Sequence, residues 1–293
     1  MKNTIVHIAA ITSMFFWGLT YVWSKFVFET YTPLTTITLR LLGSFIVLYL
    51  FIYLTNRNEK IKVKDRKLLI TSAFFNPFFY FLGEYYGLSM VSASISALIV
   101  STIPIFTPFV AKKIFNEKLS IFNVIGLIVS FAGVLIIVLK RDFSLNASGL
   151  GISLLFLAVF SAVIYSVMVK KLTDSYSPIT IIANQNLIGT LLFLPMFLYF
   201  DFNSFIEITP STMTLLSLFM LSVFGSSICY VLYAFVIKRI DLSKANIYTN
   251  LIPIFAGIAS YFFLDEYFNN VKIIGMLIVI IGIILSQVKF SRK

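Results

Sequence analysis

Long apolar runs separated by short polar stretches fill almost the whole chain. A helix needs about 20 apolar residues to cross a membrane, and backbone groups in lipid must bond within their own segment, which favours helix. The runs are apolar at consecutive positions, as at 134–139, and so lack the alternation of a membrane β-barrel. The pattern predicts an all-α integral membrane protein with ten transmembrane helices. The expected spans are 4–27, 33–54, 68–88, 94–114, 120–139, 149–169, 178–199, 212–237, 243–264 and 271–288.

Composition supports lipid as the solvent. The 293 residues are 59% hydrophobic and 12% charged, whereas soluble domains have about 45–50% apolar and about 25% charged residues. Ten helices leave no room for a soluble catalytic domain. A single cysteine, Cys229, and a single histidine, His7, exclude an internal disulfide and a Cys- or His-rich metal cluster. We therefore expect no metal, no cofactor and no enzyme activity, and we attribute the net charge of +11 to topology rather than to a nucleic-acid partner.

The loops between the expected spans divide the 23 Lys and Arg residues unequally. Most of these residues fall at the termini or in loops on one side, above all in the segment 57–67. The other side holds only Lys25, Lys140, Arg141 and Lys272. Because loops rich in Lys and Arg stay in the cytoplasm, both termini are predicted to be cytoplasmic. We expect a multi-pass protein of the plasma (inner) membrane, with the lipid bilayer around it.

Two short matches indicate an internal duplication. Residues 31–35, Tyr-Thr-Pro-Leu-Thr, resemble residues 176–180, Tyr-Ser-Pro-Ile-Thr, 145 positions later. Residues 103–106, Ile-Pro-Ile-Phe, recur unchanged at 252–255, 149 positions later. Each repeat has an odd number of spans, five, so the second half is expected to be inverted relative to the first. The predicted domains are 1–144 and 145–293, a plan typical of secondary transporters, although duplication without transport is the alternative.

A wider set of motifs follows the same order along the first half. These are Tyr-Tyr-Gly-Leu at 85–88, Ser-Ala-Ser at 92–94, Ile-Pro-Ile-Phe at 103–106, Phe-Asn-Glu-Lys at 115–118, Gly126 and Gly133, with Trp17-Gly18 and Leu39-Arg40 before them. The chain thereby resembles the EamA-type branch of the drug/metabolite transporter superfamily, although residues 240–243 depart from the pattern. The resemblance implies a ten-helix bundle with cytoplasmic termini, a central cavity, and transport of amino acids, metabolites or drugs.

The functional hypothesis is a secondary transporter of small organic solutes, such as amino acids or related metabolites, that works by alternating access. Export is the favoured direction, although the residues alone do not distinguish export from import. No phosphate-binding loop of the Gly-x-x-x-x-Gly-Lys-Ser/Thr type is present, so a solute or proton gradient would supply the energy. The alternatives are a membrane-embedded enzyme, a channel or a scaffold, and both a monomer and a homodimer stay open.

Two charged side chains lie clearly within expected spans, Arg40 and Glu84. Counted from the predicted helix ends, Arg40 lies about 10 Å and Glu84 about 6 Å below the outer surface. Charged groups in a membrane are costly and usually face a cavity or a partner. The two are candidates for a gate or a substrate anchor, with Glu84 a candidate proton carrier. The alternative is a structural ion pair or snorkelling to the interface.

Polar and aromatic side chains add further candidates. Span 68–88 places Asn76, Tyr80, Gly83, Glu84 and Gly87 on one stripe, which is expected to face inward. In the repeat alignment the matched prolines Pro104 and Pro253 predict helix kinks, and such sites mark binding regions in transporters. Packing and interhelical hydrogen bonds are the alternative for each residue. The candidate pathway residues are Trp17, Tyr21, Asn76, Tyr80, Glu84, Ser101, Tyr165, Tyr230, Tyr233, Asn246 and Asn250.

The matched acids Glu117 and Glu266 come just before predicted helices and are expected to accept backbone N–H bonds near a helix start, a structural role.

Overall fold

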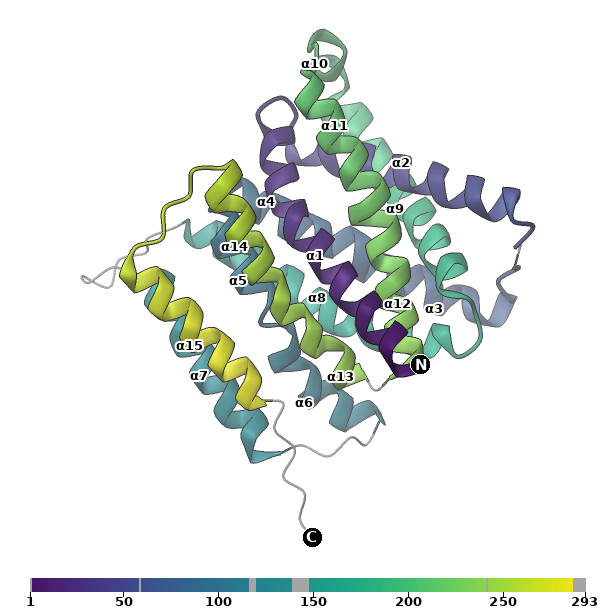
Figure 1. Ribbon diagram of the computed structural model, residues 1–293. Helices are drawn as coiled ribbons and strands as arrows, with labels where there is room; N and C mark the ends of the chain where they lie inside the picture. Colours follow the sequence, from purple (N-terminus) through teal and green to yellow (C-terminus); the bar gives the residue numbers. More distant parts are fainter. Residues whose placement is uncertain (1, 58, 116–119, 139–147, 241, 287–293) are drawn as a thin grey trace.

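The computed structural model describes residues 2–57, 59–115, 120–138, 148–240 and 242–286. These residues form helices and turns, with no strand among them (Figure 1). This confirms the prediction of an all-α protein with helices of membrane length. The described helices long and apolar enough to cross a membrane are Thr4–Phe28, Pro33–Leu54, Ala93–Ile114, Gly149–Thr173, Pro178–Phe200 and Thr212–Arg239, with Tyr248–Phe263 and Ile273–Gly282 as shorter apolar helices.

The helical elements follow one another with short connections. In chain order they are α1 (Lys2–Phe28), α2 (Pro33–Leu54), α3 (Val63–Ala73), η1 (Phe74–Phe79), α4 (Tyr80–Met90), α5 (Ala93–Val100), α6 (Ile103–Phe115), α7 (Ile121–Val138), α8 (Gly149–Thr173), α9 (Pro178–Phe200), α10 (Phe202–Glu207), α11 (Thr212–Met220), η2 (Leu221–Ile228), α12 (Cys229–Arg239), α13 (Leu242–Ile247), η3 (Tyr248–Leu251), α14 (Ile252–Phe263) and α15 (Asn270–Ser286).

Helices α2 and α9 begin in the same way, with a hydroxyl residue followed by proline. Thr32 accepts a hydrogen bond from the Thr35 N–H at 3.1 Å, and Ser177 accepts one from the Thr180 N–H at 3.4 Å. Proline suits the first helical position because its missing N–H has no intrahelical acceptor there. Each of these helix starts also binds an acidic side chain. At α2, Asp201 accepts a hydrogen bond from the Thr35 N–H at 3.1 Å, and at α9, Glu59 accepts one from the Ser177 N–H at 2.9 Å.

Two long helical segments contain wide π-helical turns. Element η1 joins α3 to α4 and contains Asn76 in an extended conformation (φ −147°, ψ 118°) before Pro77. Element η2 joins α11 to α12 through a segment rich in serine and glycine. The expected spans 68–88 and 212–237 are therefore helical but irregular near their middle. Proline explains the first irregularity, since it cannot donate a backbone hydrogen bond to the preceding turn.

Two other expected spans, 94–114 and 243–264, each contain a local irregularity, although Ala93–Ile114 as a whole is still long enough to cross a membrane. The irregularity between α5 and α6 lies at Ser101 and Thr102, whose hydroxyls donate to the carbonyl oxygens of Leu98 and Ile99 at 2.6 Å. The irregularity between α13 and α14 is the short 3₁₀ helix η3. Pro104 and Pro253 are each the second residue of the helix that follows. Both prolines, where helix kinks were expected, thus lie just after an irregular segment.

The bundle is assembled from close helix pairs, α7 with α15, α4 with α8, α2 with α9 and α1 with α14. Figure 1 shows α7 and α15 side by side at one edge. Glycine allows the close approach of α4 to α8, because a Cβ at Gly83 would lie 2.4 Å from the Leu154 carbonyl oxygen. Gly83 and Gly87 both face α8. The stripe expected on span 68–88 is thus divided between a glycine face for packing and a polar face.

Two ends of the bundle can be distinguished by their hydrogen bonds. At one end, Tyr176 connects the segment after α2 with the end of α12, since its hydroxyl accepts from the Lys62 N–H at 3.0 Å and its carbonyl from Lys238 at 3.1 Å. This end, which holds Lys62, Lys170 and Lys238, is called the basic end. At the other end, called the opposite end, Lys25 and Glu266 lie near the start of α5.

Candidate functional site

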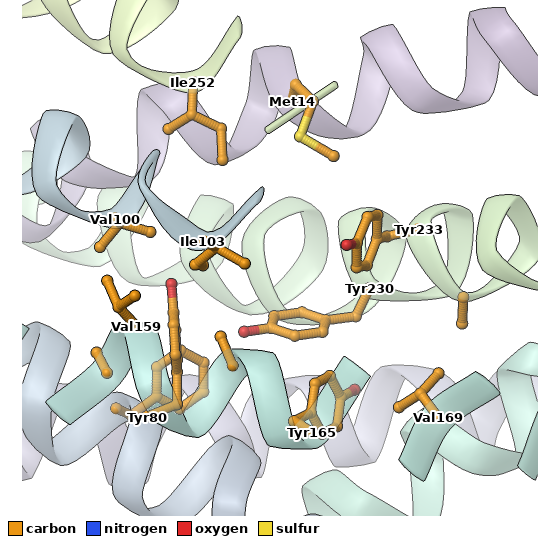
Figure 2. Close-up of a cluster of buried hydrophobic side chains, with 14 of the residues drawn as sticks. Met14, Tyr80, Val100, Ile103, Val159, Tyr165, Val169, Tyr230, Tyr233 and Ile252 are labelled. Atoms are coloured by element: carbon orange, nitrogen blue, oxygen red, sulfur yellow. The ribbon is translucent and has the colours of Figure 1, made fainter. Parts of the chain in front are cut away.

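A cavity of about 50 Å³ lies among the helices of the bundle. Side chains from α1, α2, η1, α4, α5, α6, α8, α12, η3 and α14 line it. Figure 2 shows the tyrosines of this region, from α4, α8 and α12, beside apolar side chains of α5, α6 and α14. The lining residues are Trp17, Thr20, Tyr21, Arg40, Asn76, Tyr80, Phe81, Glu84, Val100, Ile103, Ala162, Tyr165, Ser166, Tyr230, Tyr233, Thr249 and Ile252.

Arg40 is the buried cation of this cavity, with 2% of its surface exposed. Its Nε donates to the Ser226 hydroxyl at 2.7 Å, and its Nη1 donates to the Tyr85 hydroxyl. The guanidinium also lies over the Phe81 ring, 4.4 Å from the centroid, a distance suited to a cation–π contact. The partners of Arg40 are thus neutral hydroxyls and rings. A guanidinium held in this way keeps its positive charge available to an anionic group in the cavity.

Glu84 lines the same cavity from α4, whereas Arg40 lines it from α2. Its Oε1 accepts a hydrogen bond from the Tyr80 hydroxyl at 2.8 Å. The buried Tyr21 hydroxyl also interacts with Glu84. Among the described residues Arg40 and Glu84 form no direct ion pair, and their charges interact across a longer distance. The cavity therefore presents a guanidinium and a carboxyl group at separate points.

Aromatic rings form much of the remaining wall. The Trp17 ring makes edge contacts with Tyr230 and Tyr233, with centroids 5.0 and 5.1 Å apart. Asn76, placed by the irregular turn η1, donates from Nδ2 to the Tyr230 hydroxyl at 3.2 Å. The Tyr165 hydroxyl donates to Gln185 Oε1 at 3.0 Å. These contacts fix the ring orientations and leave ring faces and hydroxyls around the cavity.

The expected pathway residues thus divide into two groups. Trp17, Tyr21, Asn76, Tyr80, Glu84, Tyr165, Tyr230 and Tyr233 line the cavity together with Arg40. Asn246 lies behind this wall, since its Oδ1 accepts from the Tyr233 hydroxyl and its Nδ2 donates to Thr107 at 2.7 Å. Ser101 is buried and bonded within its own helix, and Asn250 carries a buried Oδ1 without a hydrogen-bond partner in the described residues. The last three residues do not line the cavity.

Several lining residues were missed from the sequence. Phe81, which carries the cation–π contact, looks like any other aromatic residue of a helix rich in phenylalanine and tyrosine. Ala162 and Ser166 are small and carry no chemical signal. The repeat did contain a usable signal for one pair, because Ile252 follows Ile103 by 149 positions and both line the cavity.

Two half-buried lysines close the ends of the bundle, and the sequence predicted only their place relative to the membrane. At the opposite end, Lys25 Nζ donates to the carbonyl oxygen of Val91, the residue after α4, at 2.7 Å. At the basic end, Lys170 Nζ donates to the carbonyl oxygens of Ile237 at 2.6 Å and Ile240 at 3.0 Å, where α12 ends. Each lysine satisfies carbonyls that a helix leaves free at its C-terminus.

The opposite end has one further contact. Glu266 Oε1 accepts from the Ala93 N–H at 2.8 Å, and Oε2 accepts from the Ser94 N–H at 3.4 Å and from the Ser94 hydroxyl. The carboxylate therefore occupies the N-terminus of α5, where the free N–H groups and the helix dipole favour negative charge. The matched Glu117 lies outside the described residues. Glu266 thus accepts N–H bonds at a helix start. The helix is α5 of the first half, not the helix that follows Glu266 in the sequence.

Comparison with known proteins shows which transporters this chain resembles. The chain is 24% identical to an uncharacterized transporter of Archaeoglobus fulgidus over 97% of this chain and 98% of the relative. It is 25% identical to the uncharacterized transporter YoaV of Bacillus subtilis over 100% and 99% of the two chains. A WAT1-related chloroplastic protein of Arabidopsis thaliana is 28% identical over 94% of this chain and 67% of its own length.

One solved crystal structure shares the fold, with a TM-score of 0.73 over 96% of each chain at 13% identity. The sequence model of the EamA-like transporter family matches residues 4–139 and 149–287. These two stretches span nearly all of the sequence, including every residue that lines the cavity. The chain therefore belongs to the EamA-like transporter family, and it is a transmembrane transporter.

Proposed function

We propose that the protein is a ten-helix carrier of two inverted five-helix halves, residues 1–144 and 145–293, which moves a small organic solute by alternating access around the central cavity. The observation that carries the proposal is the lining of the cavity. Most lining residues occur in pairs 145 or 149 positions apart, so that both halves contribute to one site. The pairs are Trp17 with Ala162, Thr20 with Tyr165, Tyr21 with Ser166, Phe81 with Tyr230, Glu84 with Tyr233, Val100 with Thr249, and Ile103 with Ile252.

The lysine contacts support alternating access. Lys25 and Lys170 are 145 positions apart, and their acceptors Val91 and Ile240 are 149 positions apart. One contact lies at each end of the bundle, and both are formed in this structure. We infer that these contacts hold the two ends together, as expected of a state that is open to neither side. Release of one contact at a time would open the cavity to one side of the membrane, as expected of inverted repeats.

The polar groups of the cavity favour a solute that carries both charges. The guanidinium of Arg40 suits a carboxylate, which it can bind in a bidentate manner. The carboxylate of Glu84 suits an ammonium group, and the surrounding rings favour a cation or an apolar side chain. The cavity of about 50 Å³ has room for a few water molecules only, so the helices must move apart to admit the solute. Amino acids and related metabolites are the proposed class.

The basic end is proposed to be cytoplasmic in a plasma membrane, because loops rich in Lys and Arg remain inside, and export to be the direction. Counterflow in proteoliposomes tests the proposal. Vesicles preloaded with unlabelled amino acids, nucleosides or cationic drugs are given a trace of labelled solute outside. A carrier accumulates the label transiently, and only when the preloaded solute is a substrate.

The same vesicles distinguish the competing functions. A channel would give a flux that rises with concentration without saturation and would show no counterflow. A scaffold would give no flux with any of the three classes. Conversion of a solute or lipid to a new product, detected by mass spectrometry, would show an enzyme instead. Saturable counterflow that disappears in the Arg40→Gln variant is the result expected for the proposed site.

A further inference from the structure

A second cavity, separate from the central one, lies at the basic end. Its volume is about 440 Å³, and α2, α3, α9 and residues 59–61 line it. Figure 1 shows these three helices together on the side of the bundle away from the α7–α15 pair. None of its lining residues lines the central cavity. The second cavity is therefore not an extension of the proposed solute site.

Two of the three charged residues that line this cavity are cations. Lys60 and Arg66 line it, both are exposed, and neither makes a hydrogen bond or an ion pair with any residue that the structure describes. Glu59 also lines the cavity, but its carboxylate accepts from the Ser177 N–H at the start of α9. The charges left to meet a ligand are thus those of the lysine and the arginine.

The contacts of Glu59 with the start of α9 favour its ionised form. Burial raises its pKa, but hydrogen bonds from the Ser177 N–H and hydroxyl and from the Thr180 hydroxyl, with the charge of Lys238, lower the pKa by more. The Glu59 charge is therefore balanced within the protein, by the helix start and by Lys238. It does not neutralise Lys60 and Arg66.

Among the other lining residues, Tyr49, Thr180 and Asn184 are polar, and the rest are four isoleucines and one leucine. Ile52 and Leu69 are buried, Ile188 is half-buried, and Ile70, which is 45% exposed, forms an apolar edge toward the outside of the bundle. An exposed isoleucine favours contact with lipid over water. A ligand that enters past Ile70 can place an apolar chain against it and an anionic group near Lys60 and Arg66.

We propose that this cavity binds one anionic phospholipid, whose phosphate is held by Lys60 and Arg66 and whose acyl chain lies against Ile70 and Ile188. Charge complementarity selects the occupant. The cationic end attracts a negatively charged headgroup in the cytoplasmic leaflet, and the apolar wall distinguishes a lipid from a free phosphate ion. The site depends on the proposed orientation of the chain in the membrane, and it does not depend on which solute is transported.

Native mass spectrometry of the full-length protein in detergent tests the site. The protein is titrated with phosphatidylglycerol, with phosphatidylcholine and with inorganic phosphate in separate arms. One phosphatidylglycerol is expected to bind at least about tenfold more tightly than phosphatidylcholine, because basic residues near the membrane surface favour anionic lipid. Inorganic phosphate is expected not to compete. Competition by inorganic phosphate at millimolar concentration would show a phosphate-ion site and overturn the lipid proposal.

A pair of double variants assigns the lipid to this cavity. Lys60→Gln with Arg66→Gln is expected to weaken phosphatidylglycerol binding about tenfold or more and to remove the preference over phosphatidylcholine. Arg57→Gln with Lys64→Gln removes the same charge from the same exposed segment, outside the cavity, and is expected to change binding less than about threefold. An equal effect of both pairs would show a general attraction to the surface and would overturn the site.

A third variant tests the apolar wall with the charges intact. Ile188→Trp places a larger side chain in the cavity and is expected to abolish binding of the tight phosphatidylglycerol, while the protein stays monodisperse in size-exclusion chromatography. Unchanged lipid binding in this variant would mean that the lipid lies elsewhere.

Discussion

The two halves of the chain, residues 1–144 and 145–293, make matching contacts at the ends of the bundle but present different side chains at its centre. Lys25 and Lys170 each donate to the carbonyl of a helix C-terminus. At the cavity, Glu84 of the first half corresponds to Tyr233 of the second at a spacing of 149. The end contacts are features that a gate needs on both sides, whereas a single bound solute needs only one set of charges.

The same difference separates Arg40 from Gln185, which follows it by 145 positions. Each side chain reaches a helix of the other half. Arg40 donates to Ser226 at 2.7 Å, and Gln185 donates to Ser72 at 2.7 Å. Both thus serve as interhelical hydrogen-bond donors, but only Arg40 adds a charge to the cavity lining. In the proposed carrier, this pair of positions is therefore where the two halves would differ in their contact with the solute.

Replacement of Arg40 is expected to have the largest effect. Arg40→Gln copies the side chain of the second half, keeps a donor and removes the charge. Loss of one partner of a buried, hydrogen-bonded charge pair costs about 2–5 kcal/mol, so the affinity for a carboxylate-bearing solute should fall about 30-fold or more. Solute affinity in proteoliposomes measures the change. Gln185→Ala, which removes a neutral hydrogen-bonding group, is the control and should cost less than about tenfold.

An analogue without the carboxylate separates binding from structure. If Arg40 holds the solute carboxylate, the Arg40→Gln variant and the native protein should bind the decarboxylated analogue with similar affinity. An equal loss for both compounds would show that Arg40 only supports the packing of the bundle.

The two lysine contacts are expected to act in opposite directions. A hydrogen bond to a charged group contributes about 1.5–3 kcal/mol, so removing one contact should change the ratio of inward-open to outward-open states about 10-fold to 100-fold. Lys25→Met should expose the cavity from the opposite end and Lys170→Met from the basic end. The measurement is labelling of Thr249→Cys, in a Cys229→Ser background, with a membrane-impermeant maleimide added to one side of the vesicles.

The neighbouring Lys171 provides the control for this pair. It is exposed and forms no hydrogen bond or ion pair with the described residues, so Lys171→Met removes the same charge without removing a contact. Labelling that increases from the same side in both contact variants would contradict a separate gate at each end.

Replacement of Glu266 should shift the ratio of inward-open to outward-open states in the same direction as replacement of Lys25, but by less. Its carboxylate accepts from two N–H groups at the start of α5, and loss of a helix cap costs about 0.5–2 kcal/mol. Glu266→Ala is therefore expected to favour opening at the opposite end, as Lys25→Met does. Because the charges of the two residues interact, the double variant should be non-additive in the labelling assay. Strict additivity would show that the two contacts act independently.

The sequence predicted the helical class, the membrane and most cavity residues, because apolar run length and rare polar residues are local signals. It predicted irregular helices near Pro104 and Pro253, but not the turn at Ser101–Thr102, whose hydroxyls donate to backbone carbonyls, or the 3₁₀ helix at Tyr248–Leu251. It also did not predict the partners of Lys25 and Lys170, which depend on where another helix ends. The sequence does show that Lys25 and Lys170 are 145 positions apart. A single matched residue is not evidence of a shared role until the carbonyl acceptors of both lysines are known.

The smallest expected effect concerns the acids at the starts of α2 and α9. Glu59 caps α9 and Asp201 caps α2. Because hydrogen bonds and Lys238 lower the pKa of Glu59 despite its burial, this residue stabilises the fold above its ordinary pKa of about 4.5. That stabilisation is lost as the pH falls through the lowered pKa. An acid near a helix start contributes about 0.3–1 kcal/mol, and solvent screening places Glu59 at the lower end.

Thermal unfolding in detergent between about pH 7 and pH 3 measures this contribution. Glu59→Gln should unfold at a slightly lower temperature than the native protein at pH 7, and the difference should vanish at the acid limit, where both side chains are neutral. Asp201→Asn makes the matched change at the opposite end. A Glu59→Gln difference that persists unchanged at the lowest pH would show that packing of the side chain, rather than its charge, holds the start of α9.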